Sequence, residues 1–463
     1  MKRDFPFLKE LQKHLYGRSL LAEEIPFPLE TIGYHQEQGY VSGIPGVERE
    51  KGRFVCRRCG CREQRLFYSF PCKRCGKICS YCRSCIMMGR VSECSLLYSW
   101  AGDHYSFSVP EHPMLWDGTL SQGQKTASQA VAEAVTRNEE VLVWAVCGAG
   151  KTEVLFQGIE TALKSEKRVC IATPRTDVVL ELAPRLKQAF PGIDVAALYG
   201  GSEDRHMLAP LTVSTTHQLF RFQQAFDTII IDEVDAFPYS MDPSLQYAAD
   251  KSKKTQSSTI YLTATPSKKM QSSARSGKLA HVTIPARYHR KPIPVPEMKW
   301  CGNYPKQFLK KVIPAAIKEW VKKRLEAETP ILLFFPSIVM MESVLPLFQH
   351  LHEGLISVHS QDPERKEKVS ALRKGEVPGL LTTTILERGV TIPRLDVAVI
   401  GAEHEVFSES ALVQISGRVG RSSQHYSGNV TFFHYGKTNS MVSAVHHISH
   451  MNSEARKRGL LDE

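Results

Sequence analysis

The sequence predicts an α/β protein with two tandem parallel-sheet domains, preceded by a small metal-binding module. Two observations support this prediction. Beyond Pro110, short β-branched apolar runs alternate with helix-like stretches, a pattern that is typical of βαβ units around a parallel sheet. Nine of the twelve cysteines lie between Cys56 and Cys94, which sets this short segment apart from the rest of the chain.

The apolar runs fall into two groups separated by a stretch rich in proline, from Pro285 to Pro305. The runs before it are 141–146, 169–173, 229–231 and 259–263, and those after it are 331–335, 380–384 and 397–400. We therefore predict five parts: an N-terminal segment (1–50), a cysteine module (51–95), a first α/β domain (110–284), a linker with a helical connection (285–325) and a second α/β domain (326–463).

Composition and charge narrow the class of protein. A chain of 463 residues with 42% hydrophobic residues can form about three domains. No apolar run approaches the ~18 residues of a membrane span, and the first residues lack a signal peptide's apolar core, so we expect a cytoplasmic protein. The net charge of +11 favours a polyanionic partner.

A phosphate-binding loop follows the run at 141–146. Small residues there let backbone N–H groups surround phosphates at a helix N-terminus. Lys151 should reach the β- and γ-phosphates of ATP, and Thr152 should offer its hydroxyl to Mg²⁺. A chance glycine-rich turn would seldom also end in Lys-Thr. The residues expected to bind the nucleotide here are Gly148, Ala149, Gly150, Lys151 and Thr152.

Two adjacent carboxylates, Asp232 and Glu233, end the apolar run at 229–231. Ligands of parallel sheets bind at the carboxyl ends of the strands. We therefore expect Asp232 to hold Mg²⁺ through its water shell and Glu233 to orient the attacking water. The alternative, a pair of helix-capping acids, is less favoured because the strand follows the phosphate loop at a distance that suits one domain.

From about residue 120 onward, the chain resembles the superfamily-2 helicases, which have two RecA-like domains. The resemblance rests on four ordered segments: 120–124, 263–265, 382–393 and 414–421. It implies that Gln124 contacts the adenine base, that 263–265 couples hydrolysis to domain movement, and that 382–393, which includes Gly389, contacts both ATP and nucleic acid.

The last of these segments carries two arginines, Arg418 and Arg421. Phosphoryl transfer spreads negative charge over the γ-phosphoryl oxygens, and guanidinium groups delivered from the second domain would stabilise that charge. We expect both arginines to be catalytic, together with Lys151, Asp232 and Glu233. An arginine pair could also be an ordinary charged surface, but its place at the end of the ordered series argues against that.

The same resemblance implies a nucleic-acid track along the strand ends. Hydroxyl groups, a helix N-terminus and an arginine suit contact with a phosphate backbone that does not depend on sequence. Serine and threonine are nevertheless common at strand ends in any α/β fold. The residues expected to contact DNA are Arg175, Thr215, Thr216, His217, Thr382 and Thr383.

Three segments narrow the resemblance to one family: 173–182, 232–238 and the cysteine-rich 81–90. They resemble ComFA, the late-competence ATPase of naturally transformable Gram-positive bacteria. The resemblance implies a motor at the inner face of the cell membrane that draws transforming single-stranded DNA through a membrane channel. Its partners would then be single-stranded DNA and competence DNA-uptake proteins, with a homo-oligomer as an open alternative.

The cysteine module predicts at least one structural zinc site, because paired Cys-x-x-Cys segments place four thiolates around Zn²⁺. The family resemblance favours Cys56, Cys59, Cys82 and Cys85 as its ligands. Four others are left to form a second site or to replace one ligand: Cys61, Cys72, Cys75 and Cys79. Eleven basic residues and one acid between Lys51 and Arg90 suggest DNA contact by this module, with a solvated basic face as the alternative.

Two other functions stay open at this point. One is a duplex-unwinding helicase of replication restart or recombination, which a strand-displacement assay would distinguish. The other is a non-catalytic nucleic-acid-binding module with an inactive nucleotide site. Against the second stands the intact set of charged site residues, of which inactive homologues usually lose at least one. The leading hypothesis is an ATP-dependent single-stranded DNA translocase that uses ATP, Mg²⁺ and Zn²⁺.

Overall fold

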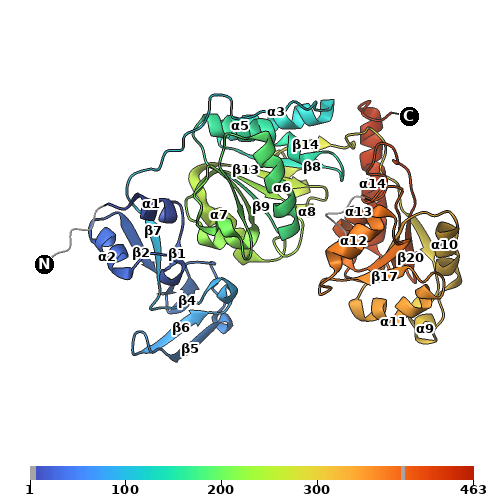
Figure 1. The fold of residues 1–463 in the computed structure, drawn as a ribbon, viewed down its shortest axis with the longest axis horizontal. Helices are drawn as coiled ribbons and strands as arrows, with labels where there is room; N and C mark the ends of the chain where they lie inside the picture. Colours follow the sequence, from blue (N-terminus) through green and yellow to red (C-terminus); the bar gives the residue numbers. More distant parts are fainter. Residues whose placement is uncertain (1–6, 387–391, 463) are drawn as a thin grey trace.

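The computed structural model describes residues 7–386 and 392–462 and arranges them in three parts in chain order (Figure 1). A small N-terminal part precedes two α/β domains. Gly389, expected to contact ATP and nucleic acid, lies outside the described residues. Within the described part of the chain, no helix is both long and apolar enough to span a bilayer.

The N-terminal part combines a three-stranded antiparallel sheet, in the order β1-β7-β2, with two separate hairpins, β3–β4 and β5–β6. Strands from either side of the cysteines, β2 and β7, therefore pair with each other. The elements are α1 (Lys9–Leu15), β1 (Leu20–Leu21), η1 (Ala22–Glu24), α2 (Leu29–Glu37), β2 (Val41–Pro45), β3 (Val47–Glu50), β4 (Arg53–Cys56), η2 (Gln64–Leu66), β5 (Phe67–Pro71), β6 (Ile78–Cys82), η3 (Ile86–Met88) and β7 (Leu96–Trp100).

The first α/β domain is built on a seven-stranded parallel sheet in the order β10-β11-β9-β12-β13-β8-β14. Its elements are α3 (Gln122–Arg137), β8 (Glu140–Ala145), α4 (Lys151–Val154), α5 (Phe156–Lys164), β9 (Val169–Thr173), α6 (Thr176–Ala189), β10 (Val195–Leu198), η4 (Glu203–His206), β11 (Leu211–Thr215), η5 (Thr216–Arg221), β12 (Phe226–Asp232), α7 (Pro243–Ser252), β13 (Lys253–Thr263), α8 (Lys268–Arg275) and β14 (Ala280–Ile284).

The second α/β domain has a six-stranded parallel sheet in the order β15-β20-β19-β16-β18-β17. Its elements are β15 (Glu297–Trp300), α9 (Tyr304–Leu309), α10 (Ala315–Glu326), β16 (Ile331–Phe334), α11 (Ile338–Gln349), β17 (Leu355–Val358), α12 (Arg365–Lys374), β18 (Gly379–Thr382), η6 (Thr384–Leu386), β19 (Asp396–Ile400), α13 (Glu409–Ser416), β20 (Val430–His434) and α14 (Asn439–Lys457). The predicted fold class is thus confirmed.

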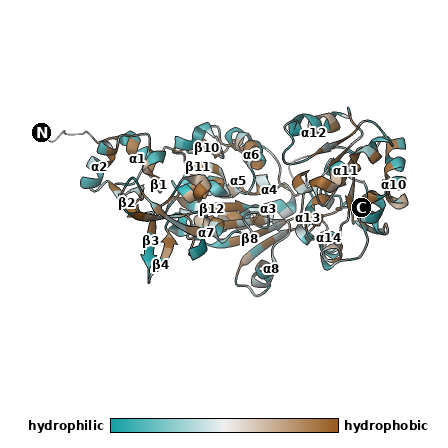
Figure 2. Ribbon diagram, turned by 90° about the horizontal axis from the view of Figure 1, so that it is seen from below, coloured by the Kyte–Doolittle hydropathy of each residue, from teal (hydrophilic) through white to brown (hydrophobic). Residues whose placement is uncertain are grey.

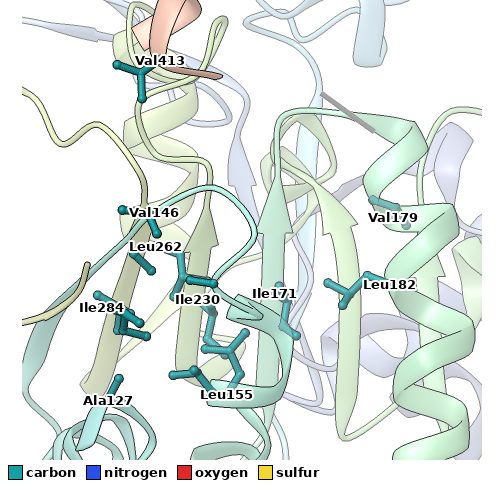
Figure 3. Packing of buried hydrophobic residues seen from close by; sticks show 14 of the residues in the cluster. Ala127, Val146, Leu155, Ile171, Val179, Leu182, Ile230, Leu262, Ile284 and Val413 are labelled. Atoms are coloured by element: carbon teal, nitrogen blue, oxygen red, sulfur yellow. The ribbon is translucent and has the colours of Figure 1, made fainter. Parts of the chain in front are cut away.

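Alternate residues of each strand face opposite sides of its sheet, and both sides are buried, which explains the unbroken apolar runs. In β9, Ile171 belongs to the apolar cluster that includes residues of α5 and α6 (Figure 3), whereas Cys170 belongs to the cluster that includes residues of α7 and the first cysteine group. Apolar residues accordingly concentrate in the central strands, and the helices present polar surfaces outward (Figure 2). The cysteine module therefore belongs to the core on one face of the first sheet.

Candidate nucleotide and metal sites

A cavity of about 260 Å³ between the two α/β domains collects most of the predicted nucleotide residues. It lies at the carboxyl ends of β8 and β12, where ligands of parallel sheets bind. Ala149 is buried and does not line it. The predicted residues that line the cavity are Gly148, Gly150, Lys151, Thr152, Asp232, Glu233, Arg418 and Arg421.

The phosphate-binding loop turns sharply between β8 and α4. Gly148 and Gly150 have φ angles of +82° and +68°, the left-handed region that glycine tolerates best. A Cβ atom on Gly150 would also come within 2.3 Å of the Gln124 Nε2 atom. Lys151 and Thr152 open α4, so their backbone N–H groups belong to a helix start, where phosphates bind.

Gln124 lies beneath this loop and is buried, and it does not line the cavity. Its Nε2 group donates to the carbonyls of Ala149 (2.9 Å) and Gly150 (3.3 Å). Its Oε1 atom accepts from the backbone N–H of Ser121 at 2.8 Å, as part of a capping box at the start of α3. The structure thus gives Gln124 contacts that support the loop, and its contact with the adenine base stays a prediction.

The two carboxylates sit at the end of β12. Glu233 has a φ of +56°, an uncommon backbone conformation for a residue other than glycine. Its N–H donates to Asp232 Oδ1 at 2.9 Å, and its Oε2 atom lies 3.9 Å from Arg175 Nε. Strained backbone of this kind concentrates at functional sites, where it aims a side chain. Arg175, expected on the DNA track, is therefore close to the predicted water-orienting carboxylate.

Arg287 is a site residue that the sequence did not indicate. It is buried after β14, and its Nη1 group donates to the carbonyls of Val419 (2.8 Å) and Gly420 (2.6 Å). These carbonyls belong to the loop that carries Arg418 and Arg421. Burial lowers the pKa of Arg287 to about 10, so the group keeps its charge at neutral pH. The segment just after the first domain thereby holds the arginine loop of the second.

Asp235 is a second residue that the motifs did not single out. Its Oδ2 atom accepts hydrogen bonds from Thr265 Oγ1 at 2.8 Å and from Ser410 Oγ at 2.5 Å, and its Oδ1 atom accepts one from Thr263 Oγ1. Ser410 lies in α13 of the second domain. One carboxylate therefore links the predicted coupling segment to the neighbouring domain.

The expected DNA residues are spread over both domains. Thr215 and Thr216 are buried at the end of β11, His217 beside them is exposed, and Thr383 is half-buried. Thr382 is also buried and donates to the Val358 carbonyl at 3.0 Å. The hydroxyl of Thr382 is therefore engaged within the sheet.

A cavity of about 510 Å³ lies beside these strand ends, between α6 and α12. Three basic side chains, Arg365, Lys366 and Arg373, line it together with three acidic ones, Asp177, Asp362 and Glu367. An ion pair between Arg365 Nη2 and Asp177 Oδ2, at 2.8 Å, joins the two domains at its edge. The cavity therefore has contributions from both domains, and its basic side chains are matched by an equal number of acidic ones.

The first cysteine group has the predicted composition: Cys56, Cys59, Cys82 and Cys85. All four side chains are buried, and their Sγ atoms lie within 4.8 Å of one another. Two pairs, Cys56–Cys85 and Cys59–Cys82, have Sγ–Sγ distances of 3.8 and 3.6 Å. Thiolates bound tetrahedrally to Zn²⁺ at about 2.3 Å would be about 3.8 Å apart, so this group fits zinc.

The second cysteine group differs from the expectation at one position. It consists of Cys72, Cys75, Cys79 and Cys94, and Cys61 belongs to neither group. Cys94 was missed because it lies outside any Cys-x-x-Cys pair, in the loop before β7, and only the folded chain brings it to the others.

Buried charges attach the first cysteine group to the first α/β domain. Arg58 is fully buried and pairs with Glu24 Oε2 at 2.5 Å, and Arg221 Nε pairs with Glu24 Oε1 at 2.7 Å. Lys251 of α7 donates to the carbonyls of Arg58 (2.9 Å) and Phe220 (3.0 Å). Because buried ions need partners, these contacts fix the module in one position.

Two parallel-sheet domains with a cavity between them are typical of superfamily-2 helicases. Models of the type III restriction enzyme res subunit and of the helicase conserved C-terminal domain match residues 117–268 and 312–423. The ComFA N-terminal domain model matches residues 4–99. The chain belongs to the ComFA family of competence proteins.

Two relatives establish this membership. Competence protein ComFA of Bacillus subtilis is 50% identical over 99% of this chain and 98% of its own length. Its counterpart from Streptococcus pneumoniae is 37% identical over 91% of this chain and 95% of its own length. Among solved structures, Mycobacterium smegmatis helicase Lhr bound to ssDNA and AMP-PNP has a TM-score of 0.50 at 17% identity, covering 73% of this chain and 50% of that one, which supports the fold alone.

Proposed function

We propose that the protein is an ATP-driven motor that moves along single-stranded DNA and serves the uptake of transforming DNA during competence. The observation that carries the proposal is the cavity between the domains, because Lys151 and Glu233 from one domain meet Arg418 and Arg421 from the other. A site completed by two domains couples hydrolysis to their relative movement.

Each side chain has a distinct role in this proposal. Lys151 binds the β- and γ-phosphates, and Thr152 and Asp232 would hold Mg²⁺, which neutralises phosphate charge when bound. Glu233 orients the attacking water, and the 3.9 Å approach of Arg175 ties this carboxylate to the start of α6. Arg418 and Arg421 stabilise the charge that develops on the γ-phosphoryl oxygens.

The cavity between α6 and α12, to which Arg365, Lys366 and Arg373 contribute cations, is the proposed path of the DNA backbone. It borders both domains, so closing and opening them would alternate the grip on phosphates. The Arg365–Asp177 ion pair crosses this path and would open when phosphate competes for Arg365. Membership in a family of competence proteins supports single-stranded DNA as the substrate. It also supports DNA-uptake proteins, including a membrane channel, as partners, and a position at the inner face of the membrane. A homo-oligomer fits the same proposal.

Zinc at the first cysteine group completes the proposal. Zn²⁺ would be bound by Cys56, Cys59, Cys82 and Cys85 in a closed structural site. The ion would stiffen the part of the N-terminal module that packs on α7, and the adjacent basic residues would then contact DNA from a fixed position.

The test is ATP hydrolysis by the purified protein alone and with single-stranded DNA, duplex DNA or single-stranded RNA. We expect single-stranded DNA to stimulate turnover most, and Lys151→Ala to abolish it, because the phosphates lose their cation. Lys164→Ala is the matched control, since Lys164 is exposed on α5 and pairs only with Glu160 among the ion pairs of the described residues. Hydrolysis by Lys151→Ala at the wild-type rate, or stimulation by RNA alone, would contradict the proposal.

A further inference from the structure

The β5–β6 hairpin gathers four thiols that the proposed function does not use. We propose that Cys72, Cys75, Cys79 and Cys94 bind a second Zn²⁺ ion, separate from the ion at the first cysteine group. Their Sγ atoms all lie within 4.8 Å of one another, and Cys72 Sγ lies 3.7 Å from Cys94 Sγ. This distance is close to the roughly 3.8 Å edge of a zinc tetrathiolate and far longer than the ~2.05 Å of a disulfide.

The backbone around the first two of these cysteines repeats the backbone of the first group. At the second group, the Cys72 N–H donates to the Lys77 carbonyl at 2.9 Å, and the Gly76 N–H donates to the Cys72 carbonyl at 2.9 Å. Gly76 has a φ of +70°. Such a turn points both thiols and several N–H groups toward one point, as a metal-binding turn requires.

The equivalent turn at the first group has the same two hydrogen bonds. The Cys56 N–H donates to the Cys61 carbonyl at 3.0 Å, the Gly60 N–H donates to the Cys56 carbonyl at 2.9 Å, and Gly60 also has a φ of +70°. Cys61 in the first turn therefore corresponds to Lys77 in the second, and in both turns the backbone carbonyl of this residue accepts the hydrogen bond from the first cysteine. This equivalence explains why Cys61 is not a ligand of either site.

Hydrophobic packing does not account for this gathering of thiols. The first four cysteines belong to the large apolar cluster shared with α7, but none of the second four does. The hairpin lies at the far edge of the N-terminal part in Figure 1, and its Tyr68 and Ile78 are 57% and 69% exposed. Two strands of five residues are marginally stable alone, so a cross-link at their open end would hold them together.

One strand, β6, would serve both ions. Cys79 belongs to the second group and Cys82 to the first, and a separation of three residues places them on opposite faces of the strand. The second group is also more accessible, since Cys75 and Cys94 are half-buried whereas the first four cysteines are all buried. The inferred second ion is therefore the one more open to chelators.

The test is the zinc content of the full-length protein, purified with reductant, loaded with excess Zn²⁺ and passed through a desalting column. Elemental analysis should give two zinc ions per chain for the wild type, one for each group. Cys94→Ser should reduce this to one, and Cys61→Ser should leave two. One ion in the loaded wild-type protein, or loss of an ion in Cys61→Ser but not in Cys94→Ser, would overturn the proposal.

Cobalt gives a second readout. Thiolates bound to tetrahedral Co²⁺ absorb by charge transfer, and this absorbance per chain should halve in Cys94→Ser while the far-ultraviolet circular dichroism stays unchanged. If Cys94→Ser does not fold, Cys75→Ser in the half-exposed turn serves instead. The full wild-type absorbance in a folded variant would refute the site. Because Lys151→Ala should keep both ions, failure of this inference is distinguishable from failure of the proposed ATPase.

Discussion

At the residue scale, Arg287 links the segment just after β14 to the arginine loop of the second domain. It donates to the carbonyls of Gly417 (3.3 Å), Val419 and Gly420, so three contacts fix the loop between α13 and β20. The planar guanidinium reaches all three carbonyls, which an ammonium group could not do with the same geometry. Arg287 is thus a positioning residue for Arg418 and Arg421.

We predict that Arg287→Gln lowers kcat for ATP hydrolysis on the order of a hundredfold, because a shift of about 1 Å in the arginine loop misplaces groups that stabilise the transition state. The measurement is steady-state kinetics with saturating single-stranded DNA. KM for ATP should change less than kcat, since the phosphate-binding loop is untouched.

The control for this prediction is Arg290→Gln, three residues further along. Arg290 pairs with Asp462 at 2.6 Å and is partly exposed, away from the arginine loop. It should retain wild-type kcat. Equal losses in both variants, or a lower melting temperature that accounts for the loss in Arg287→Gln, would contradict a positioning role.

The sequence could indicate a site residue only where the partners of that residue lie close to it along the chain. Lys151, Asp232 and Glu233 could be predicted because their chemistry is tied to a strand and the loop that follows it. Arg287 and Cys94 could not, since their partners are more than a hundred residues away or belong to another turn. Gln124 was placed in the right segment, but its contacts with the loop depend on packing that no local pattern records.

At the element scale, the first cysteine turn (residues 56–61) packs closely against α7, and we call this contact the joint. Tyr247 of α7 packs against Gly60 so closely that a Cβ atom there would lie 2.6 Å from the tyrosine ring. The corresponding Gly76 has nothing within 4 Å of its would-be Cβ atom. Both glycines have the same φ, so they differ in their surroundings alone.

We predict that Gly60→Ala destabilises the protein more than Gly76→Ala. Both substitutions place alanine in the left-handed region at a cost of about 1–2 kcal/mol. Only Gly60→Ala also forces a side chain into the joint, which adds about 1–3 kcal/mol for overpacking. Urea unfolding followed by circular dichroism measures the difference.

A double substitution provides the control. Gly60→Ala combined with Tyr247→Ala should recover most of the extra loss, because the ring that would clash is gone. No recovery, or equal destabilisation by the two glycine substitutions, would show that the joint does not depend on this contact.

Strands were predicted well from the sequence where their apolar runs are long, and less well where the strands lie at the edges of the sheets. The buried strands β8, β9, β12, β13, β16, β18 and β19 each overlap a predicted run, and the runs at β8, β16 and β18 extend one or two residues past the end of the strand. Strand β15 (Glu297–Trp300) was not predicted, because it pairs with β20 alone and lies in a proline-rich stretch that suits a linker. Edge strands bury fewer residues, so their sequences carry a weaker pattern.

At the scale of the whole molecule, the two α/β domains approach each other closely where Gly417 meets Cys147. A Cβ atom on Gly417 of the second domain would come within 2.5 Å of the Cys147 Cβ atom in the first. Gly417 has a φ of −64°, which any residue can adopt, so only this contact requires glycine. Val413 of α13 belongs to an apolar cluster that includes residues of both domains (Figure 3).

We predict that Gly417→Ala prevents full closure of the domains and lowers DNA-stimulated ATP hydrolysis at least tenfold, with little change in melting temperature. A displacement of about 1 Å is enough for such a loss. Small-angle scattering with a non-hydrolysable ATP analogue should show a larger radius of gyration than for the wild type.

Gly436→Ala is the matched control, because Gly436 is exposed after β20 and a Cβ atom there would have nothing within 4 Å. It should hydrolyse ATP and close like the wild type. Normal closure by Gly417→Ala would refute the steric argument.

The joint between α7 and the cysteine turn also restricts how the amino-acid sequences of such proteins can change during evolution. Tyr247 meets Gly60, and Lys251 meets the carbonyl of Arg58, so the surfaces on the two sides cannot drift independently. Substitutions on one side should be inherited together with changes on the other. A chimaera that exchanges the cysteine module between distant homologues should therefore also carry the matching α7 and the matching partner of Glu24 at position 221.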